Sequence, residues 1–327
     1  MNPKLKTIQR NFARAAACYA EHAVLQAEVE QRTLERLDYF QLDPGVVLDL
    51  GCGPARALPT FRDRYPRARK LLLDLAEPML SAVPRRTRFR RLPHHPIVAD
   101  MHQLPLADAS VDLIFSSLAL QWAQDLDAVF KECRRVLRPN GLLLFATLGP
   151  QTLYELRRAA DNAGMPVGIN HFPDMHDVGD ALVRAGLGDP VMDREELILE
   201  YRGVQDLLAD LKRIGANTRL QASEDTPRSL RGRAWLEALN QTYAAFAQGD
   251  VLPATYEVVY GQASCPPQGA RPQDGSTVVG GEVHIPVERI RRGPRADTSG
   301  PDPYPPAGQN TNGTGHSTRP LASGGAD

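Results

Sequence analysis

Cysteine and aromatic residues are sparse in this sequence, and neither sign of charge is in excess. The four cysteines lie far apart and form no C-x-x-C pair, which argues against both a disulfide framework and a zinc site. We therefore expect free thiols, as in a reducing compartment. The 38 basic and 39 acidic residues give a net charge of -1, so neither nucleic acid nor a membrane surface is expected as a partner.

Long apolar runs are also missing. No stretch approaches the ~18 consecutive apolar residues of a membrane span, and the N-terminus lacks the apolar segment of a secretory signal. Residues 1–20 contain basic residues and no acid, as organelle transit peptides do, but serine is absent there and a basic helix of the domain is favoured. We expect a soluble, cytoplasmic protein.

Short apolar runs alternate with helical patterns from Val46 onward. The helical pattern is clearest at 126–137, where apolar residues recur every three or four positions. Such alternation is typical of an α/β fold, with a central, mostly parallel sheet and helices on both faces. The expected strands are residues 46–51, 70–76, 96–100, 111–118 and 141–149, and a turn is expected at 138–141.

The later part of the chain is mainly helical. Residues 152–248 hold four helical segments and one expected strand, at 195–201, and a final strand at 255–263 is expected to close the sheet. The helical segments thus form an insertion before the last strand.

The composition changes after residue 263. Proline and glycine make up about a third of residues 264–327, and such a composition cannot bury enough apolar surface to fold. We expect one domain over 1–263 and a mostly disordered tail over 264–327, within which 281–290 is the best candidate for a short ordered piece.

The stretch "VVLDLGCGPARALP", Val46 to Pro59, predicts a strand, a glycine turn and a helix start. Gly51 and Gly53 would let the backbone approach a ligand closely. A dinucleotide-binding turn would carry a third glycine at position 56, where Arg56 stands instead. A reactive cysteine is the other reading, but Asp49 disfavours a thiolate, so Cys52 is expected to be inert.

Acidic residues stand at the carboxyl ends of three successive expected strands. Asp49 could bind a cationic amine, Asp74 could accept hydrogen bonds from both hydroxyls of a ribose, and Asp100 with Met101 could hold an adenine. Any one of them could instead be a helix cap. Together they describe an amine, a ribose and an adenine without phosphate, which is the make-up of S-adenosylmethionine.

Several stretches resemble known enzymes. "LDLGCGPA", "LDLAEPML", "ADMHQLPLADASVDLIFSSLALQW" and "RVLRPNGLLLFATLG" are similar to the successive motifs of class I S-adenosylmethionine-dependent methyltransferases, which have a Rossmann-like fold. More narrowly, "NFARAAACYAEHAVLQ", "FATLGPQTLYELRRA", "HFPDMHDV" and "LLADLKRIGANT" resemble the malonyl-[acyl-carrier protein] O-methyltransferase family of biotin synthesis. The likeness covers about residues 8–263. Ala55 stands where many relatives carry a third glycine, and alanine suits that position unless its backbone is left-handed.

The resemblance implies methylation of the free carboxylate of malonyl-acyl carrier protein, or of malonyl-coenzyme A, by S-adenosylmethionine. It assigns cofactor binding to 45–150 and recognition of substrate and carrier to 151–250. No metal and no general base are expected, because a carboxylate is already ionised at pH 7. The implied cofactor-binding residues are Asp49, Gly51, Gly53, Asp74, Leu75, Met79, Asp100, Met101, Ser116 and Gln121.

The substrate side is also assigned from the resemblance. Tyr19, His171 and Phe172 are expected to position the reacting groups, and Trp122 to contact the substrate. The aromatic residues could equally be core residues, and the histidine a structural hydrogen-bond partner. Because acyl carrier protein is acidic, its docking face is expected to be basic. Residues of 202–233, among them Lys212, Arg213 and Arg219, are expected to form it together with Lys4, Lys6, Arg10 and Arg14.

Other readings stay open. The arginine-rich run at 85–91 is read as a solvated loop, with carrier docking or nucleic-acid contact as alternatives. Within the same fold the chain could be a quinone C-methyltransferase or a protein arginine hydroxylase of complex assembly. It could also be a scaffold that binds S-adenosylmethionine without catalysis.

Overall fold

The computed structural model describes residues 3–83, 93–164, 169–215 and 233–267, and the backbone of 277–279 and 282–284. The chain divides into one unit over residues 1–269 and a second over 270–327. In the second unit, the described residues form an antiparallel ladder of β8 (Thr277–Val279) and β9 (Glu282–His284). The predicted domain boundary after residue 263 falls inside β7 (Leu252–Ser264), one residue before that strand ends.

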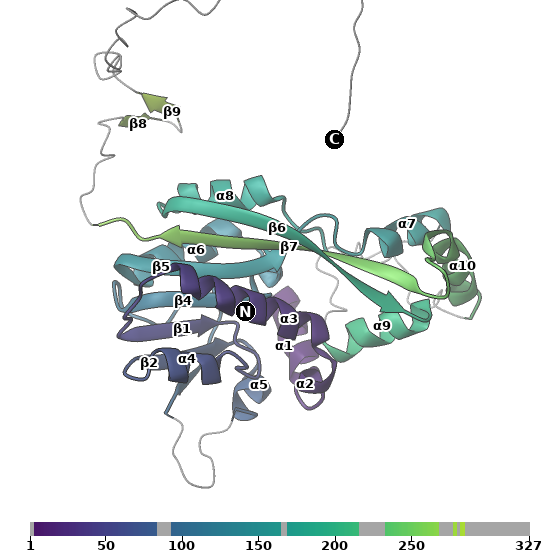
Figure 1. The fold of residues 1–327 in the computed structure, drawn as a ribbon, viewed down its shortest axis with the longest axis horizontal. Coiled ribbons are helices and arrows are strands. Elements are labelled where there is room, and N and C mark those ends of the chain that lie inside the picture. The colour runs from purple at the N-terminus through teal and green to yellow at the C-terminus, as the bar shows by residue number, and fades with distance from the viewer. Residues whose placement is uncertain are drawn as a thin grey trace, which may run out of the picture. The chain divides into compact units, whose positions relative to one another are not determined.

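A central sheet organises the first unit. Its seven strands in the described part of the chain lie in the order β3-β2-β1-β4-β5-β7-β6 (Figure 1). Strands β1 to β5 run parallel to one another, and the five predicted strands are confirmed. Their bounds are β1 (Val46–Leu50), β2 (Arg69–Asp74), β3 (His95–Val98), β4 (Val111–Ser117) and β5 (Leu137–Leu148).

β7 is the last strand of this sheet in the sequence, but it does not lie at the edge of the sheet. β7 pairs antiparallel with β5 on one side and with β6 (Gly188–Tyr201) on the other, so the prediction that 255–263 closes the sheet is wrong. Buried residues occupy almost the whole of β7, whereas half-buried and exposed residues alternate along β6. A strand that is buried on both faces belongs inside a sheet, and an alternating strand suits its edge.

The segment 138–141, predicted as a turn, is an irregular part of β5. Leu137 pairs with Val111 and Leu142 pairs with Leu113, so that 138–141 stand opposite the single residue Asp112. Asn140 has φ 65 there. The segment therefore combines a turn-like backbone with strand pairing, as a β-bulge does.

Helices cover both faces of the sheet, as predicted. α3 (Val24–Glu35) and α4 (Leu58–Arg64) bury Leu34 and Phe61 against Val47 of β1 and Phe115 of β4. α6 (Leu126–Val136) and α8 (Met175–Arg184) bury their apolar sides against the other face, where Leu48 and Ile114 point. Neighbouring residues of β1 thus serve opposite faces, because successive side chains of a strand alternate.

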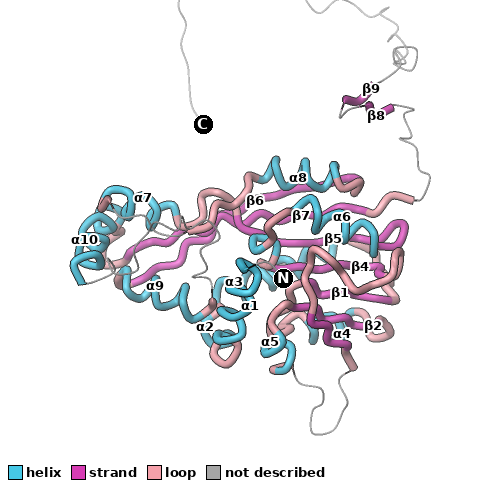
Figure 2. Tube along the Cα trace, turned by 180° about the vertical axis from the view of Figure 1, so that it is seen from behind, coloured by secondary structure: helices cyan, strands magenta, loops and turns pink. Residues whose placement is uncertain are grey.

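The sheet is extended at one end by β6 and β7, which reach beyond the other strands (Figures 1 and 2). Around this extension gather α7 (Tyr154–Asn162), α9 (Val204–Arg213) and α10 (Arg233–Tyr243). A separate core forms there from Leu156, Leu207, Leu239 and Tyr256. Since α9 and α10 stand between β6 and β7 in sequence, the predicted helical insertion before the last strand is confirmed.

The remaining elements are short or N-terminal. α1 (Pro3–Ala15) contacts α5 (Glu77–Ser81), and α2 (Tyr19–His22) contacts α9. The 3-10 helices of the described residues are η1 (Arg36–Tyr39), η2 (Leu120–Trp122) and η4 (Ala244–Phe246). Within the described ranges, no helix is both long and apolar enough to cross a membrane.

Candidate active site

The candidate site lies at the carboxyl ends of β1 and β2, where the glycine turn begins. Gly51 has φ 71 and Gly53 has φ 51, a left-handed backbone that glycine adopts without steric cost. The Gly51 amide donates to the Leu73 carbonyl at 2.7 Å, and the Gly53 amide donates to Asp74 Oδ2 at 2.9 Å. A Cβ at Gly51 would lie 2.2 Å from Ala119 Cβ, so the turn requires glycine there.

Two non-glycine residues of this turn are also informative. Ala55 has φ 55, so its backbone is left-handed and alanine is strained there, at a cost of about 1–2 kcal/mol. Cys52 is buried, and burial raises the pKa of its thiol; Asp49 and Asp74 raise it further. The thiol therefore stays protonated, which agrees with the inert cysteine predicted.

A cleft beside the turn brings together most of the residues predicted to bind a cofactor. Asp49, Gly51, Gly53, Asp74, Leu75, Met79 and Met101 all line it. An adjoining hollow contains Asp100 beside Met101 and Leu75. Residues at or just after the ends of three different strands thus meet at one edge of the sheet, with carboxylates and apolar side chains next to each other.

Carboxyl groups dominate the deep part of this cleft. Asp49 is 2% exposed, and its Oδ2 has no hydrogen-bond partner in the described part of the chain. Burial raises the pKa of Asp49, and Glu30 and Asp74 add to the effect. Burial also raises the pKa of Glu30, on α3, to about 7, against the opposing effect of Arg56. Such a site favours a bound cation, which would relieve the repulsion among the carboxylates.

Asp74 and Asp100 are partly engaged by the protein itself. Asp74 Oδ1 accepts the Ala76 amide at 2.8 Å, besides the bond from Gly53, so this carboxylate also fixes the turn. Asp100 Oδ1 accepts the His102 amide at 3.0 Å and lies 2.6 Å from His102 Nδ1. The protein's own hydrogen bonds therefore hold both carboxylates in place, Asp74 in the cleft and Asp100 in the adjoining hollow.

Ser116 does not reach the cleft. Its side chain is fully buried, and its hydroxyl donates to the Leu50 carbonyl at 2.8 Å, so the structure gives it a role in joining β4 to β1. The neighbouring Ser117 lines the cleft instead, with a buried hydroxyl that has no partner among the described residues. The geometry therefore does not support Ser116 as a cofactor-binding residue, since successive side chains of a strand lie on opposite faces.

The N-terminal helices form one side of the cleft. Gln9 of α1 donates from Nε2 to the Leu75 carbonyl at 3.0 Å. Arg56 donates to the Ala23 carbonyl at 3.1 Å and also to the Ala20 carbonyl. The residue that excluded a dinucleotide turn therefore ties the N-terminal segment to the glycine turn.

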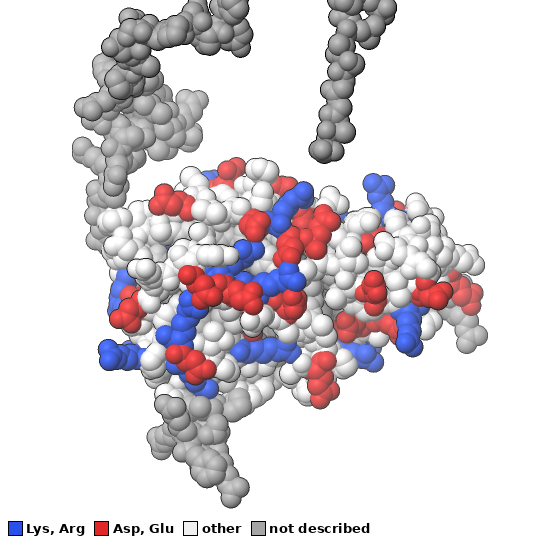
Figure 3. All heavy atoms as spheres, viewed as in Figure 1, with Lys and Arg blue, Asp and Glu red and all other residues white. Residues whose placement is uncertain are grey.

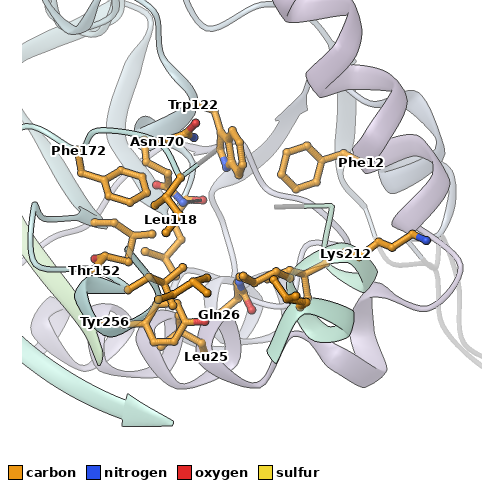
Figure 4. Close-up of a pocket in the computed structure, with 18 of the residues that line it drawn as sticks. Phe12, Leu25, Gln26, Leu118, Trp122, Thr152, Asn170, Phe172, Lys212 and Tyr256 are labelled. Atoms are coloured by element: carbon orange, nitrogen blue, oxygen red, sulfur yellow. Dashed lines mark hydrogen bonds between the residues drawn. The ribbon is translucent and has the colours of Figure 1, made fainter. Parts of the chain in front are cut away.

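A second compartment, mainly apolar, adjoins the cleft (Figure 4). It is a cavity of about 270 Å³ between the N-terminal helices, the end of β4, α7 and α9. Its apolar lining includes Leu25, Leu148, Leu156, Ile169, Phe172, Leu208, Leu211 and Trp235. Gln121 also lines this cavity, where its Nε2 donates to the Leu118 carbonyl at 2.6 Å; it does not line the cleft.

Five residues line both compartments and form the wall where they meet: Phe12, Tyr19, Gln26, Leu118 and Trp122. The rings of Phe12 and Trp122 meet edge to face with centroids 5.1 Å apart. Leu118 has φ 48, a strained backbone for leucine, and such strain clusters at functional sites. We name these five residues the shared wall.

Tyr19 and Gln26 supply the polar groups of the shared wall. Burial raises the pKa of the Tyr19 phenol well above its usual value, and Asp74 raises it further, so the hydroxyl remains a donor at neutral pH. Gln26 Oε1 is buried without a partner among the described residues. Both side chains can therefore bind a polar group of a ligand at the junction.

The remaining predicted substrate residues are distributed unequally. Phe172 lines the apolar cavity, but His171 is exposed and lines neither compartment, so the geometry does not support a positioning role for it. Lys212 lines the cavity, and Figure 4 shows its ammonium pointing away from it. Arg213 is exposed nearby on α9, whereas Arg219 and the arginine-rich run at 85–91 lie outside the described residues.

Sequence reasoning missed Glu30, Gln26 and Phe12 as site residues. Glu30 and Gln26 are separated by four positions, which places them on the same side of α3. That spacing was the available signal, but nothing local in the helix indicates that this side faces a ligand.

We find no group of three or more His, Cys, Asp or Glu side chains placed to hold a metal ion within the described ranges. The acidic groups that line the cleft are Glu30, Asp49 and Asp74, and the cation Arg56 lines it as well. These carboxylates suit a ligand that carries positive charge.

Known proteins resemble the chain at the levels of domain, sequence and fold. Residues 48–145 match the family model "Methyltransferase domain". A malonyl-[acyl-carrier protein] O-methyltransferase of Methylovorus sp. is 45% identical over 83% of this chain and 93% of its own length, and one of Laribacter hongkongensis is 45% identical over 86% and 96%. The fold is similar to that in a complex between the Haloferax volcanii Trm112 methyltransferase activator and a methyltransferase, with a TM-score of 0.51, 19% identity, and coverage of 81% of this chain and 100% of that one.

The two curated relatives match far more of the chain than the cofactor-binding core. Their alignments of 279 and 292 residues extend well beyond the family model, so they include the part of the chain that builds the apolar cavity. By this similarity, the chain belongs to the malonyl-[acyl-carrier protein] O-methyltransferase family of class I methyltransferases.

Proposed function

We propose that this protein transfers a methyl group from S-adenosylmethionine to the free carboxylate of a malonyl group carried as a thioester on acyl carrier protein. The product would be a methyl ester without the terminal charge, which fatty-acid synthesis could extend toward the pimeloyl precursor of biotin. The substrate is taken from the names of the relatives, and the geometry of the two compartments supports it.

The observation that carries the proposal is the shared wall. A carboxylate-lined cleft suited to a cation and an apolar cavity suited to an acyl thioester meet at the same five residues. Methyl transfer needs two ligands whose reacting atoms touch, and holding them in line can supply ~7–11 kcal/mol of the barrier. Two adjacent compartments with one wall provide that arrangement.

The cleft suits S-adenosylmethionine because a buried carboxylate oxygen there lacks a partner among the described residues, and this ligand can provide one. The buried, unpartnered oxygen of Asp49 and the neighbouring Glu30 would bind the ammonium group, and Asp74 the ribose hydroxyls. Met79 and Met101 offer apolar surface to the adenine. When bound, S-adenosylmethionine supplies an electrophilic methyl group on a sulfonium centre.

The residues of the shared wall would orient the carboxylate. Tyr19 can donate a hydrogen bond, since its phenol stays protonated, and the Gln26 amide can donate another. Phe12 and Trp122 exclude water from the junction, which strengthens these bonds. A substrate carboxylate is ionised at pH 7, so the reaction needs no general base.

The direct test is methyl transfer in vitro. Purified protein, S-adenosylmethionine and malonyl-acyl carrier protein should yield the methyl ester, detected by mass spectrometry of the intact carrier. Asp74→Ala should weaken cofactor binding by about 1–3 kcal/mol, whereas the exposed Asp63→Ala on α4 should not.

Wild-type protein that binds the cofactor but forms no ester would refute the proposal, and rescue of a biotin-requiring strain that lacks this step would support it in cells.

A further inference from the structure

A separate hollow lies on the outer side of the N-terminal helices, where the segment from α1 to α2 meets α9. It has a volume of about 420 Å³. Its polar lining comes from Asn11, Arg14, Cys18, Lys212 and Arg213. The two sides touch at the Cys18 thiol, whose sulfur lies 3.9 Å from the Arg213 carbonyl oxygen. We call this feature the basic hollow.

The basic hollow gathers three positively charged side chains. Arg14, Lys212 and Arg213 are all exposed, and no acidic residue lines the hollow. Within the described part of the chain, none of the three forms an ion pair. The nearby acid Asp210 accepts a hydrogen bond from the Tyr201 hydroxyl at 3.0 Å.

Elsewhere on the described surface, several cations are paired with acids. On the face shown in Figure 3, basic and acidic side chains lie next to each other. Arg36 pairs with Asp193 at 2.8 Å, and Arg138 pairs with Asp112 at 2.7 Å. In a protein of net charge -1, a concave site with three cations that form no ion pair among the described residues suits an anion.

The basic hollow and the apolar cavity are both lined by residues of α1 and α9. Lys212 lines both, and in Figure 4 its aliphatic chain follows the cavity while its ammonium points away. Asn11 and Cys18 face the hollow, whereas their neighbours Phe12 and Tyr19 belong to the shared wall. An anion in the hollow would thus lie just outside the proposed reaction site.

We propose that the basic hollow binds the phosphodiester group of the phosphopantetheine arm that carries the substrate. This inference rests on the proposed function, because it takes the substrate to be a carrier-bound thioester. With the acyl end in the apolar cavity, the phosphate is the charged group of the arm that remains to be held. Arginine binds phosphate through paired, charge-assisted hydrogen bonds, and lysine adds a point charge.

The test compares two small substrates, malonyl-phosphopantetheine and malonyl-pantetheine, which differ only in the phosphate. Wild-type protein should show a kcat/KM about tenfold or more higher for the phosphorylated thioester, as expected for charge-assisted bonds. In Arg14→Gln/Arg213→Gln the ratio of the two values should fall toward one. Lys212 is left unchanged, because it also lines the cavity. Arg158→Gln, an exposed position on α7, is the matched control and should keep the ratio.

Each outcome decides the inference. If the double variant keeps the wild-type ratio of the two kcat/KM values, the inference is wrong. It is also wrong if kcat/KM falls equally with both thioesters, which would indicate a structural role. Loss with malonyl-acyl carrier protein alone would mean that the carrier's own surface docks there, again against the phosphate. Retained binding of S-adenosylmethionine shows that the variant is folded. If the wild type methylates none of these thioesters, the proposed function fails; if it methylates them without discrimination, only this inference fails.

Discussion

At the scale of single residues, the cleft is governed by carboxyl groups that face few cations. Glu30 interacts with Asp49, Tyr19 and Arg56, and its negative charge raises the pKa of both Asp49 and Tyr19. Arg56 is the one cationic side chain among the described residues that line the cleft. Positive charge brought by a ligand would therefore be bound most strongly when Glu30 is ionised.

Cofactor affinity is expected to depend on pH through Glu30. Its carboxyl pKa is about 7 in the folded protein, so a cationic ligand must displace a proton at pH 6 but not at pH 8. The affinity for S-adenosylmethionine should rise roughly tenfold between these pH values, and Glu30→Gln should flatten the rise. Titration calorimetry at several pH values measures this, and an unchanged slope in Glu30→Gln would contradict it.

The same pKa predicts an effect on stability without the cofactor. A carboxyl with an ordinary pKa of 4.5 loses its proton in the unfolded chain well before folded Glu30 does. The free energy of unfolding should therefore fall as pH rises from about 4.5 to 7, and Glu30→Gln should be more stable than wild type at pH 8 by about 1–3 kcal/mol. Urea denaturation tests it, with exposed Glu35→Gln as the control.

At the scale of elements, the turn after β1 sets the geometry of the cleft. Gly51→Ala should lower the free energy of unfolding by about 2–5 kcal/mol, because a left-handed backbone and a Cβ 2.2 Å from Ala119 Cβ both oppose it. Gly53→Ala should cost only about 1–2 kcal/mol, since its Cβ would meet nothing closer than Tyr19 at 4.0 Å. Urea denaturation of the two variants distinguishes them, and equal losses would show that backbone strain alone matters.

The strands and the cofactor side could be predicted because their signals are local. Asp49, Asp74 and Asp100 each come directly after a short apolar run, and parallel strands bring such ends together. The order of β6 and β7 could not be predicted as easily, since periodicity shows which faces are buried but not which strand is the neighbour. Periodicity also could not tell Ser116 from Ser117, because a shift of one residue exchanges the two faces of a strand.

At the scale of the whole molecule, the apolar cavity depends on long-range packing. It joins Phe12 of α1, Leu118 after β4, Trp235 of α10 and Tyr256 of β7. No short stretch of sequence contains that combination, so the resemblance could suggest Tyr19, Trp122 and Phe172 but could not separate them from exposed His171. The basic hollow is also assembled from distant segments. Its cations on both sides, Arg14 of α1 and Lys212 and Arg213 of α9, were predicted to form one patch, but not that they line a single hollow with Asn11 and Cys18.

The extent of the folded unit gives the last prediction. Cys265 is 1% exposed; its amide donates to the Gly141 carbonyl at 2.8 Å, and its carbonyl accepts the Asn140 amide at 2.7 Å. Truncation after Ala263 removes these bonds and the buried side chain, and should cost about 2–4 kcal/mol of unfolding free energy. Truncation after Gly269, where the second unit begins, should leave both stability and methyl transfer unchanged. Urea denaturation and activity of the two truncated proteins provide the comparison, and a loss of stability in the longer one would show that residues 270–327 contribute to the fold.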